Sequence, residues 1–202
     1  MDKLLTVIIP VFNQEKLVIR ALESIPVRND IEIIIIDDGS TDNTWNMLLK
    51  YRQNAIAYQD IVLLYNDKNK GVGYTVNRGY DIAKGKYVVL LGSDDYFTDK
   101  FEESLNELDG TDFIYFNLED NAGNEWKITP ENKSTYVGSV KFMRREFIGD
   151  TRCPEIRAKE DLYFYNELMK KKPTEKYINK ILKHYNFPRE NSLTWLSQKG
   201  LI

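Results

Sequence analysis

Cysteine and histidine are nearly absent from this chain of 202 residues, which contains one of each, Cys153 and His184. A single cysteine cannot build a disulfide framework, and this fits a protein of the reducing cytoplasm. A single histidine excludes a His-rich metal site. Any metal ion must therefore be held mainly by carboxylates, which favours Mg²⁺ or Mn²⁺ over Zn²⁺.

Long hydrophobic runs are also absent. No window approaches about 18 uninterrupted apolar residues, so we expect no transmembrane helix. The first residues, Met1-Asp2-Lys3, lead directly into a strand-like segment without the layout of a signal peptide, which predicts a cytoplasmic protein. With 42% hydrophobic and 12% aromatic residues, the chain can bury the core of one compact domain with a smaller C-terminal part.

The net charge of −3 conceals an asymmetry. Residues 141–202 carry 14 Lys and Arg against 8 Asp and Glu, whereas the rest of the chain carries 14 against 23. The basic part is either a solvated helix face or a surface that attracts anionic lipid or a phosphate-bearing acceptor. Lys170-Lys171-Lys172 has two similar explanations, a favourable helix-dipole interaction or peripheral docking at the inner face of a membrane. We expect no nucleic-acid partner.

The first hundred residues show strands and helices in alternation. Nearly continuous apolar, β-branched runs suit parallel strands that are covered on both faces. Strands are predicted at 6–10, 31–36, 61–65 and 87–91, with helices at 14–25, from about 44, and at 72–83. Asn13 is placed to cap the first helix. This order predicts a doubly wound α/β half, in which ligands bind beyond the carboxyl ends of the strands.

The pattern changes after Asp95. A short helix carrying Phe101 and Leu105 is predicted first, followed by antiparallel strands around a turn at 121–125. Those strands are predicted at 112–119 and 126–129, followed by helices at 139–147 and 160–171 and a last strand at 181–185.

Polar clusters follow three of the predicted parallel strands: Asn13-Gln14-Glu15, Asp37-Asp38 and Ser93-Asp94-Asp95. Adjacent carboxylates at a buried strand end are costly unless a cation or hydrogen-bond donors compensate them. A divalent cation bridging to a diphosphate would do so at Asp94, and a nucleobase or ribose donor at Asp38. The alternative for Asp37 and Asp38 is turn chemistry, for which Asp-Gly-Ser-Thr-Asp is well suited.

Several motifs occur in one order along the chain. They are Ile9-Pro10-Val11-Phe12-Asn13, Asp37-Asp38-Gly39-Ser40-Thr41-Asp42, Asn69-Lys70-Gly71-Val72-Gly73 with Asn77, and Leu91-Gly92-Ser93-Asp94-Asp95. Together they resemble the inverting GT-A fold glycosyltransferases of glycosyltransferase family 2, closely over the first hundred residues. The resemblance resumes at Ala158-Lys159-Glu160-Asp161, similar to the family's Glu-Asp base motif, and at Asn191-Ser192-Leu193-Thr194, similar to a recurring C-terminal segment.

The resemblance implies a single α/β domain of the GT-A type, Rossmann-like, with a mixed sheet flanked by helices. Residues 1–98 would form the nucleotide-sugar-binding half, and residues 99–202 a small part that binds the acceptor and carries the base. The implied contacts to the nucleotide sugar are Pro10, Val11, Phe12, Asn13, Glu15, Asp37, Asp38, Gly71, Asn77, Ser93, Asp94 and Asp95.

The resemblance also implies a mechanism. Asp94 would coordinate Mn²⁺ or Mg²⁺ on the donor diphosphate, where the ion acts as a Lewis acid. Asp161, beside Glu160, would be the general base for the acceptor hydroxyl, and a single displacement would invert the anomeric carbon. The alternative for Asp161 is a helix N-terminal charge that the dipole favours. His184 either completes the metal shell or is an ordinary packed residue.

The implied function is transfer of one sugar from a nucleotide sugar, with UDP as the expected nucleotide, to a hydroxyl of a glycan or lipid-linked acceptor in surface polysaccharide synthesis. The Gln-x-x-Arg-Trp signature of processive polymerases is missing, which favours single-sugar transfer. Two departures stand out: Gly92 occupies the first acidic position of the family's Asp-x-Asp motif, and Val76 stands where many relatives carry arginine.

Other classes fit less well. A dinucleotide-binding dehydrogenase needs Gly-x-Gly-x-x-Gly after the first strand, where this chain has Val11-Phe12-Asn13-Gln14-Glu15. A sugar nucleotidyltransferase needs a Gly-rich, Arg-bearing loop there, which is also absent. The remaining rival is a catalytically degenerate relative that binds a nucleotide sugar or a partner subunit without turnover. Gly92 favours this rival, whereas the retention of Asp94, Glu160 and Asp161 argues against it.

Overall fold

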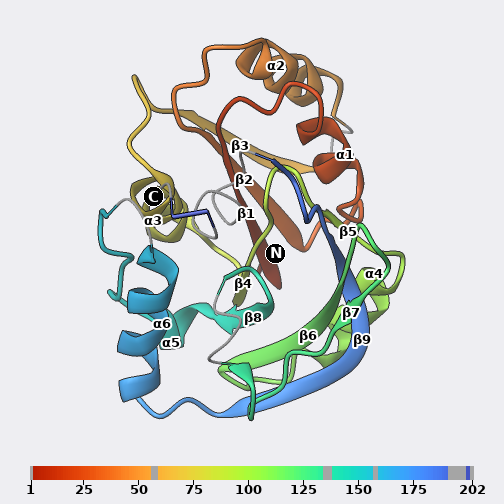
Figure 1. The fold of residues 1–202 in the computed structure, drawn as a ribbon, viewed down its shortest axis with the longest axis vertical. Coiled ribbons are helices and arrows are strands. Elements are labelled where there is room, and N and C mark those ends of the chain that lie inside the picture. The colour runs from red at the N-terminus through yellow and green to blue at the C-terminus, as the bar shows by residue number, and fades with distance from the viewer. Residues whose placement is uncertain (1, 56–58, 134–137, 157–158, 191–198, 201–202) are drawn as a thin grey trace.

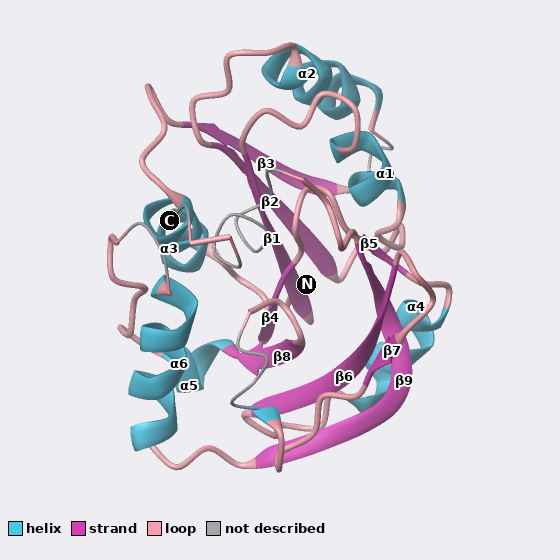
Figure 2. Cartoon of the chain, viewed as in Figure 1, coloured by secondary structure: helices cyan, strands magenta, loops and turns pink. Residues whose placement is uncertain are grey.

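The computed structural model describes residues 2–55, 59–133, 138–156, 159–190 and 199–200. Among these, nine strands form one mixed sheet in the order β3-β2-β1-β4-β8-β6-β9-β5, with β7 paired to β6, and helices flank it (Figures 1 and 2). The strands are β1 (Leu5–Val11), β2 (Ile31–Asp37), β3 (Asp60–Tyr65), β4 (Tyr87–Leu90), β5 (Tyr96–Phe97), β6 (Phe113–Asp120), β7 (Glu125–Trp126), β8 (Lys141–Arg144) and β9 (Glu175–Tyr185). The helices are α1 (Val18–Glu23), α2 (Thr44–Asn54), α3 (Val72–Ile82), α4 (Lys100–Ser104), the 3₁₀ turn η1 (Leu105–Glu107), α5 (Arg145–Ile148) and α6 (Glu160–Lys170). The predicted α/β architecture is confirmed.

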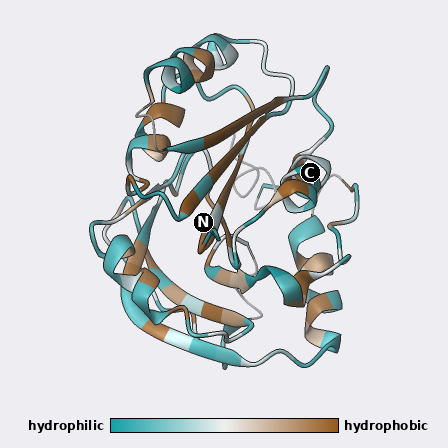
Figure 3. Ribbon diagram, turned by 180° about the vertical axis from the view of Figure 1, so that it is seen from behind, coloured by the Kyte–Doolittle hydropathy of each residue, from teal (hydrophilic) through white to brown (hydrophobic). Residues whose placement is uncertain are grey.

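The first four strands are parallel, as predicted. β1 pairs with β2 and β4, and β2 pairs with β3. Every residue of β2 is buried, which explains why its sequence is apolar at all positions but Glu32 and Asp37 and shows no alternation. Hydrophobic residues occupy much of this central part of the sheet (Figure 3). The carboxyl ends of β1, β2 and β4 therefore lie along one edge, where the candidate site forms.

The first helix differs from its prediction. α1 begins at Val18 rather than near residue 14, and Asn13 does not cap it. Asn13 instead adopts a positive φ of 51°, and its Oδ1 accepts a hydrogen bond from the Thr41 backbone N–H. The Asn13 N–H donates to Ser40 Oγ. The segment before α1 is held by the loop after β2, and this prevents it from adopting helical geometry.

The predicted helix at 139–147 is wrong. Residues 141–144 form β8, which lies between β4 and β6 and is antiparallel to both, and only α5 is helical there. Phe142 and Met143 are both buried, in core clusters on opposite faces of the sheet. A strand that is covered on both faces shows no polar alternation, so a short segment of this kind cannot be told from a buried helix by its sequence pattern.

The last strand is longer than predicted, because β9 begins at Glu175 and pairs in parallel with β6 and antiparallel with β5. The strand predicted at 126–129 ends at Trp126. Helices α3 and α6 contact each other and stand on the same side of the sheet (Figure 1). No helix in the described part of the chain has the length and apolar character to cross a membrane.

Candidate active site

Asp37 and Asp38 are buried at the end of β2. Oδ1 of Asp37 accepts the Ser40 N–H at 2.7 Å, and its Oδ2 is buried without a hydrogen-bond partner among the described residues. Burial raises the pKa of Asp37 above its usual value, although the bonds from Ser40 oppose this. Asp37 therefore shapes the turn and keeps one unsatisfied oxygen.

Asp38 organises the neighbouring loop. Its Oδ1 accepts hydrogen bonds from Asn66 Nδ2 at 2.7 Å and from the Lys70 N–H at 2.8 Å, and its Oδ2 accepts the Gly71 N–H at 2.9 Å. Gly71 has a φ of 91° and immediately precedes α3. These bonds fix where α3 begins, and the predicted contact of Asp38 with a nucleoside stays a prediction.

The loop after β1 is bound to the loop after β2. Besides the Asn13 contacts, the Glu15 side chain accepts the Asn43 N–H at 3.0 Å. Phe12 is 41% exposed at the tip of this loop, and Val11 is buried. The exposed ring of Phe12 gives the loop an aromatic surface on which a base could stack.

The carboxylate of Asp94 pairs with an arginine side chain that the sequence analysis did not identify. Nη2 of Arg189 lies 2.9 Å from Oδ2 of Asp94, and Nη2 of Arg20 donates to the Asp94 carbonyl oxygen at 2.7 Å. Burial raises the pKa of Asp94, the charge of Asp95 raises it further, and the charge of Arg189 lowers it. The only sequence signal for Arg189 was the positive surplus of the C-terminal part.

Asp95 points into the protein. Its Oδ2 accepts a hydrogen bond from buried Lys183 at 3.1 Å, and its Oδ1 accepts the Asn186 N–H at 2.9 Å. Ser93 is also buried. A Cβ on Gly92 would lie 2.8 Å from Oδ2 of Asp95 and 3.1 Å from Oδ1 of Asp94. Glycine at this position therefore leaves room for the two carboxylates as they are arranged here.

A metal site would depend mainly on Asp94. His184 stacks on the Tyr96 ring, with 4.6 Å between the ring centres, and its Nε2 lies 3.0 Å from Oδ1 of Asn121. Neither contact tests its predicted role as a metal ligand, which stays a prediction. Among the described residues, no group of three or more His, Cys, Asp or Glu side chains is placed to hold a metal ion. Mg²⁺ is often bound by one or two carboxylates together with substrate phosphates. Asp94 fits such an ion when a diphosphate supplies the other oxygens.

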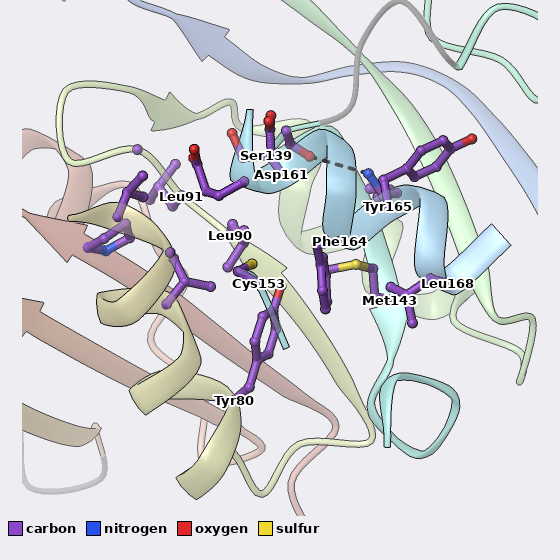
Figure 4. Close-up of a pocket in the computed structure, with 18 residues that line it drawn as sticks. Tyr80, Leu90, Leu91, Ser139, Met143, Cys153, Asp161, Phe164, Tyr165 and Leu168 are labelled. Atoms are coloured by element: carbon purple, nitrogen blue, oxygen red, sulfur yellow. Dashed lines mark hydrogen bonds between the residues drawn. The ribbon is translucent and has the colours of Figure 1, made fainter. Parts of the chain in front are cut away.

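A mainly apolar cavity of ≈190 Å³ lies between α3, α6 and β8, next to the ends of β1 and β4 (Figure 4). Asp161 and Ser139 lie at one end of the view, and Tyr80 lies at the other. Its lining consists of Pro10, Val72, Gly73, Val76, Tyr80, Leu90, Leu91, Gly92, Gly138, Ser139, Lys141, Met143, Cys153, Glu160, Asp161, Phe164, Tyr165 and Leu168. The cavity thus reaches from the strand end beside Asp94 to the first turn of α6.

The acidic side of this cavity is the N-terminus of α6, which begins at Glu160 as predicted. Burial raises the pKa of Glu160, with a smaller contribution from the charge of Asp161. Oδ1 of Asp161 accepts the Leu162 N–H at 2.8 Å, so the carboxylate is partly held by its own helix. Two acids of the second half of the chain are therefore brought to the strand ends of the first half.

Asn77 has a structural partner. Its Nδ2 donates to the Cys153 carbonyl at 2.8 Å, and the Cys153 N–H donates back to Oδ1 of Asn77 at 2.8 Å. This reciprocal pair ties α3 to the segment that leads toward α6, and it positions the cavity wall. A direct contact between Asn77 and the donor stays a prediction.

The family model "Glycosyl transferase family 2" matches residues 6–177. The chain therefore belongs to this family, as the motifs predicted.

Three relatives, compared over part of their length, are similar to it. The putative teichuronic acid biosynthesis glycosyltransferase TuaG of Bacillus subtilis is 31% identical over 170 residues, covering 76% of this chain and 66% of the relative. Glycosyltransferase GlyG of Streptococcus pneumoniae is 31% identical over 134 residues, 61% of this chain and 43% of the relative. The Escherichia coli UDP-Glc:alpha-D-GlcNAc-diphosphoundecaprenol beta-1,3-glucosyltransferase WfaP is 33% identical over 117 residues, 56% and 44% of the two chains.

Solved structures confirm the GT-A fold. S. aureus TarS residues 1–349, in complex with UDP-GlcNAc, superpose with a TM-score of 0.79 at 21% identity, covering 94% of this chain and 60% of that one. The mannosyltransferase PcManGT of Pyrobaculum calidifontis, in complex with GDP-Man and Mn²⁺, gives a TM-score of 0.74 at 15% identity, covering 96% and 60%. At these identities the likeness concerns the fold alone. The chain spans no more than about two thirds of any of these relatives.

Proposed function

We propose that this chain transfers one sugar from a nucleoside diphosphate sugar to a hydroxyl of a glycan or lipid-linked acceptor, with inversion, in the synthesis of a cell-surface polysaccharide. The observation that carries the proposal is the cavity between Gly92, next to Asp94, and Asp161. A sugar in this cavity would lie between the carboxylate proposed to hold the metal ion, Asp94, and the carboxylate proposed as the base, Asp161.

Residues of the strand-end edge would bind the donor. The loop from Pro10 to Glu15 would contact the nucleoside through the exposed face of Phe12, and Asp94 would hold Mn²⁺ or Mg²⁺ with the diphosphate. When bound, this ion supplies Lewis-acid stabilisation of the leaving diphosphate. Arg189, which is paired with Asp94, would offer a second positive charge to the same phosphates.

The chemistry proposed for the cavity is a single displacement. The acceptor oxygen bonds to the anomeric carbon while its proton passes to a carboxylate oxygen of Asp161. The bond from the anomeric carbon to the diphosphate oxygen breaks, and the nucleoside diphosphate leaves with that electron pair. Glu160, beside Asp161 on the same cavity wall, would help to position the acceptor hydroxyl.

The names of similar proteins support the proposed donor and acceptor classes. WfaP is named for a UDP-glucose donor and a diphosphoundecaprenol acceptor, and TuaG for teichuronic acid synthesis. TarS was solved with UDP-GlcNAc, whereas PcManGT was solved with GDP-Man. UDP is therefore the first nucleotide to test.

We also propose a cytoplasmic protein that works at the inner face of the membrane. Two of the lysines predicted to dock there have local partners: Lys170 pairs with Glu167, and Lys171 donates to the carbonyls of Phe147 and Ile148. These contacts favour the helix-end explanation for this cluster. A lipid-linked acceptor would then bring the chain to the membrane more than its lysines would.

A binding module without turnover is the second candidate. It is favoured by Gly92 and by Arg189 on the one carboxylate that the metal would use. In that case the chain would bind a nucleotide sugar, or a partner subunit, and leave the sugar in place.

The two candidates are separated by incubation with Mn²⁺ and a panel of nucleotide sugars, with and without acceptors, while released nucleoside diphosphate is measured. We expect release, and a fall of about 100-fold or more in Asp94→Ala and in Asp161→Asn. Asp99→Asn, an exposed aspartate just after β5, is the matched control and keeps full activity. Unchanged activity in both active-site variants would refute the mechanism. Metal-dependent UDP binding without turnover on any acceptor would favour the binding module.

A further inference from the structure

Two lysines are almost completely buried near the cavity: Lys141 on β8, 3% exposed, and Lys183 on β9, 2% exposed. Buried lysines are rare unless they are paired, because desolvation of the ammonium is costly. Nζ of Lys183 lies 3.1 Å from Oδ2 of Asp95 and 2.5 Å from Oγ of Ser139, and these partners account for its burial. The mechanism above uses neither lysine, but Lys141, unlike Lys183, lines the cavity that also holds Asp161.

Lys141 lines the cavity itself. Its Nζ lies 3.4 Å from the Gly138 carbonyl oxygen, 5.1 Å from the centre of the Tyr165 ring and 5.9 Å from that of Phe113. The ring faces attract a cation, and Tyr165 belongs to the same helix as Asp161. Figure 4 shows Asp161 and Tyr165 lining the cavity together from α6. The ammonium is thus held against the helix that carries the proposed base.

Lys141 and Asp161 both lie next to Gly138: a Cβ on Gly138 would lie 3.4 Å from Oδ2 of Asp161, and Nζ of Lys141 lies 3.4 Å from the Gly138 carbonyl oxygen. The charges around Lys141 agree with this placement. Burial lowers the pKa of Lys141 to about 8, the negative charge of Asp161 opposes this, and the positive charge of Lys183 adds to it. The other titratable side chains that share the cavity are Glu160 and Tyr165 of α6, Tyr80 of α3, and Cys153 of the segment before α6. Asp161 is the acid whose charge counteracts the desolvation of Lys141.

We propose that Lys141 is a positioning residue for Asp161: its buried ammonium stabilises the ionised carboxylate at the acidic end of the cavity and keeps it turned toward the bound acceptor. This role rests on the proposed sugar transfer, because it assigns Asp161 as the base. The ammonium does not touch the reacting atoms. It acts by keeping a negative charge stable in a mainly apolar cavity, where an isolated carboxylate would be costly.

The pairing of Lys141 with Asp161 can be tested without an activity assay, by a pH titration that follows the lysine side-chain nitrogens by NMR. We expect Lys141 to lose its proton near pH 8 in the wild type, and about one unit or more lower in Asp161→Asn, because the charge that retains the proton is gone. The spectrum of Lys141→Met assigns the signal. An unchanged midpoint in Asp161→Asn would overturn the proposal, whether or not the protein transfers sugar.

The kinetic consequence is tested with Lys141→Met, an apolar replacement of similar length. We expect kcat to fall about tenfold or more while the donor KM changes less than about twofold, because the donor phosphates are proposed to bind at Asp94 rather than at Asp161. Lys180→Met, at a partly exposed lysine of β9 that pairs with Glu103 and Glu107, is the control and keeps the wild-type kcat.

The two arms give distinct failures. An unchanged kcat in Lys141→Met, whatever its melting temperature, would make Lys141 a structural residue and refute the proposal. Absence of transfer by the wild type with every donor and acceptor would refute the proposed function instead, and the NMR titration would still decide whether Lys141 and Asp161 are paired.

Discussion

Two pairs of adjacent aspartates end parallel strands of the same sheet, and the protein holds them in different ways. Asp38, after β2, receives three hydrogen bonds, two of them from backbone N–H groups of the loop before α3. Asp94, after β4, has its carboxylate paired with one long side chain, that of Arg189. Backbone donors cannot leave without unfolding the loop, whereas a guanidinium can turn away from its partner.

The comparison shows that two Asp-Asp pairs at strand ends can have different roles in one protein. The first pair is part of the framework that fixes where α3 begins. The second pair is divided: Asp95 is tied to Lys183 and the backbone, and Asp94 alone has an exchangeable partner. We therefore expect substitutions at Asp38 to affect stability first and substitutions at Asp94 to affect donor chemistry first.

The largest expected effect is the loss of activity in Asp94→Asn. We expect donor turnover to fall by about 100- to 1000-fold, because the amide removes the negative charge that would hold the cation on the diphosphate. Initial rates with Mn²⁺ at saturating donor measure this. Full turnover in Asp94→Asn would remove the distinction between the two pairs.

Asp38→Asn should lower the free energy of unfolding by about 3 kcal/mol, because an amide nitrogen would face backbone donors that now meet a carboxylate oxygen. Urea denaturation followed by circular dichroism measures the change. Asp67→Asn, at an exposed aspartate of the loop between β3 and α3, is the control and should change this free energy by less than about 0.5 kcal/mol. Unchanged stability with lost UDP binding would instead make Asp38 a nucleoside ligand.

Arg189→Ala should weaken UDP binding by about tenfold, a change of about 1.4 kcal/mol in binding free energy. The reason is that the variant lacks a positive charge beside Asp94, where the diphosphate is proposed to bind. Titration calorimetry measures it. Arg52→Ala, at an exposed arginine of α2, is the control. An affinity for UDP that did not change would show that Arg189 only neutralises Asp94.

The smallest expected effect is a gain in stability. The pKa of Asp94 is raised in the folded chain, chiefly by burial, so its ionisation costs stability as the pH rises above the unfolded value of 3.8. Asp94→Asn should therefore melt about 2 °C higher than the wild type at pH 7, with the difference disappearing below pH 3.8. Melting curves across this range test the sign. A lower melting temperature at pH 7 would mean that the pair with Arg189 outweighs the cost of burial.

Much of the first half could be predicted from sequence because its signals are local. Continuous apolar runs bounded by polar turns identified β1 to β4, and the motif Glu160-Asp161 identified the start of α6. β8 could not be identified in this way. Its neighbours β4 and β6 lie far from it in the chain. Its two faces are buried in different core clusters, Phe142 in one and Met143 in the other.

The candidate site shows the same division. The sequence by itself placed Asp38, Asp94 and Asp161 at element ends, since turn, strand and helix-start chemistry depends on adjacent residues. The tertiary structure alone decided which of these carboxylates is engaged, and by what. Asp94 is paired with Arg189, which is distant from it in the chain. The partner that we propose for Asp161 is Lys141, which lies on another element. Charge pairing depends on distance in space, and only the folded sheet brings those atoms together.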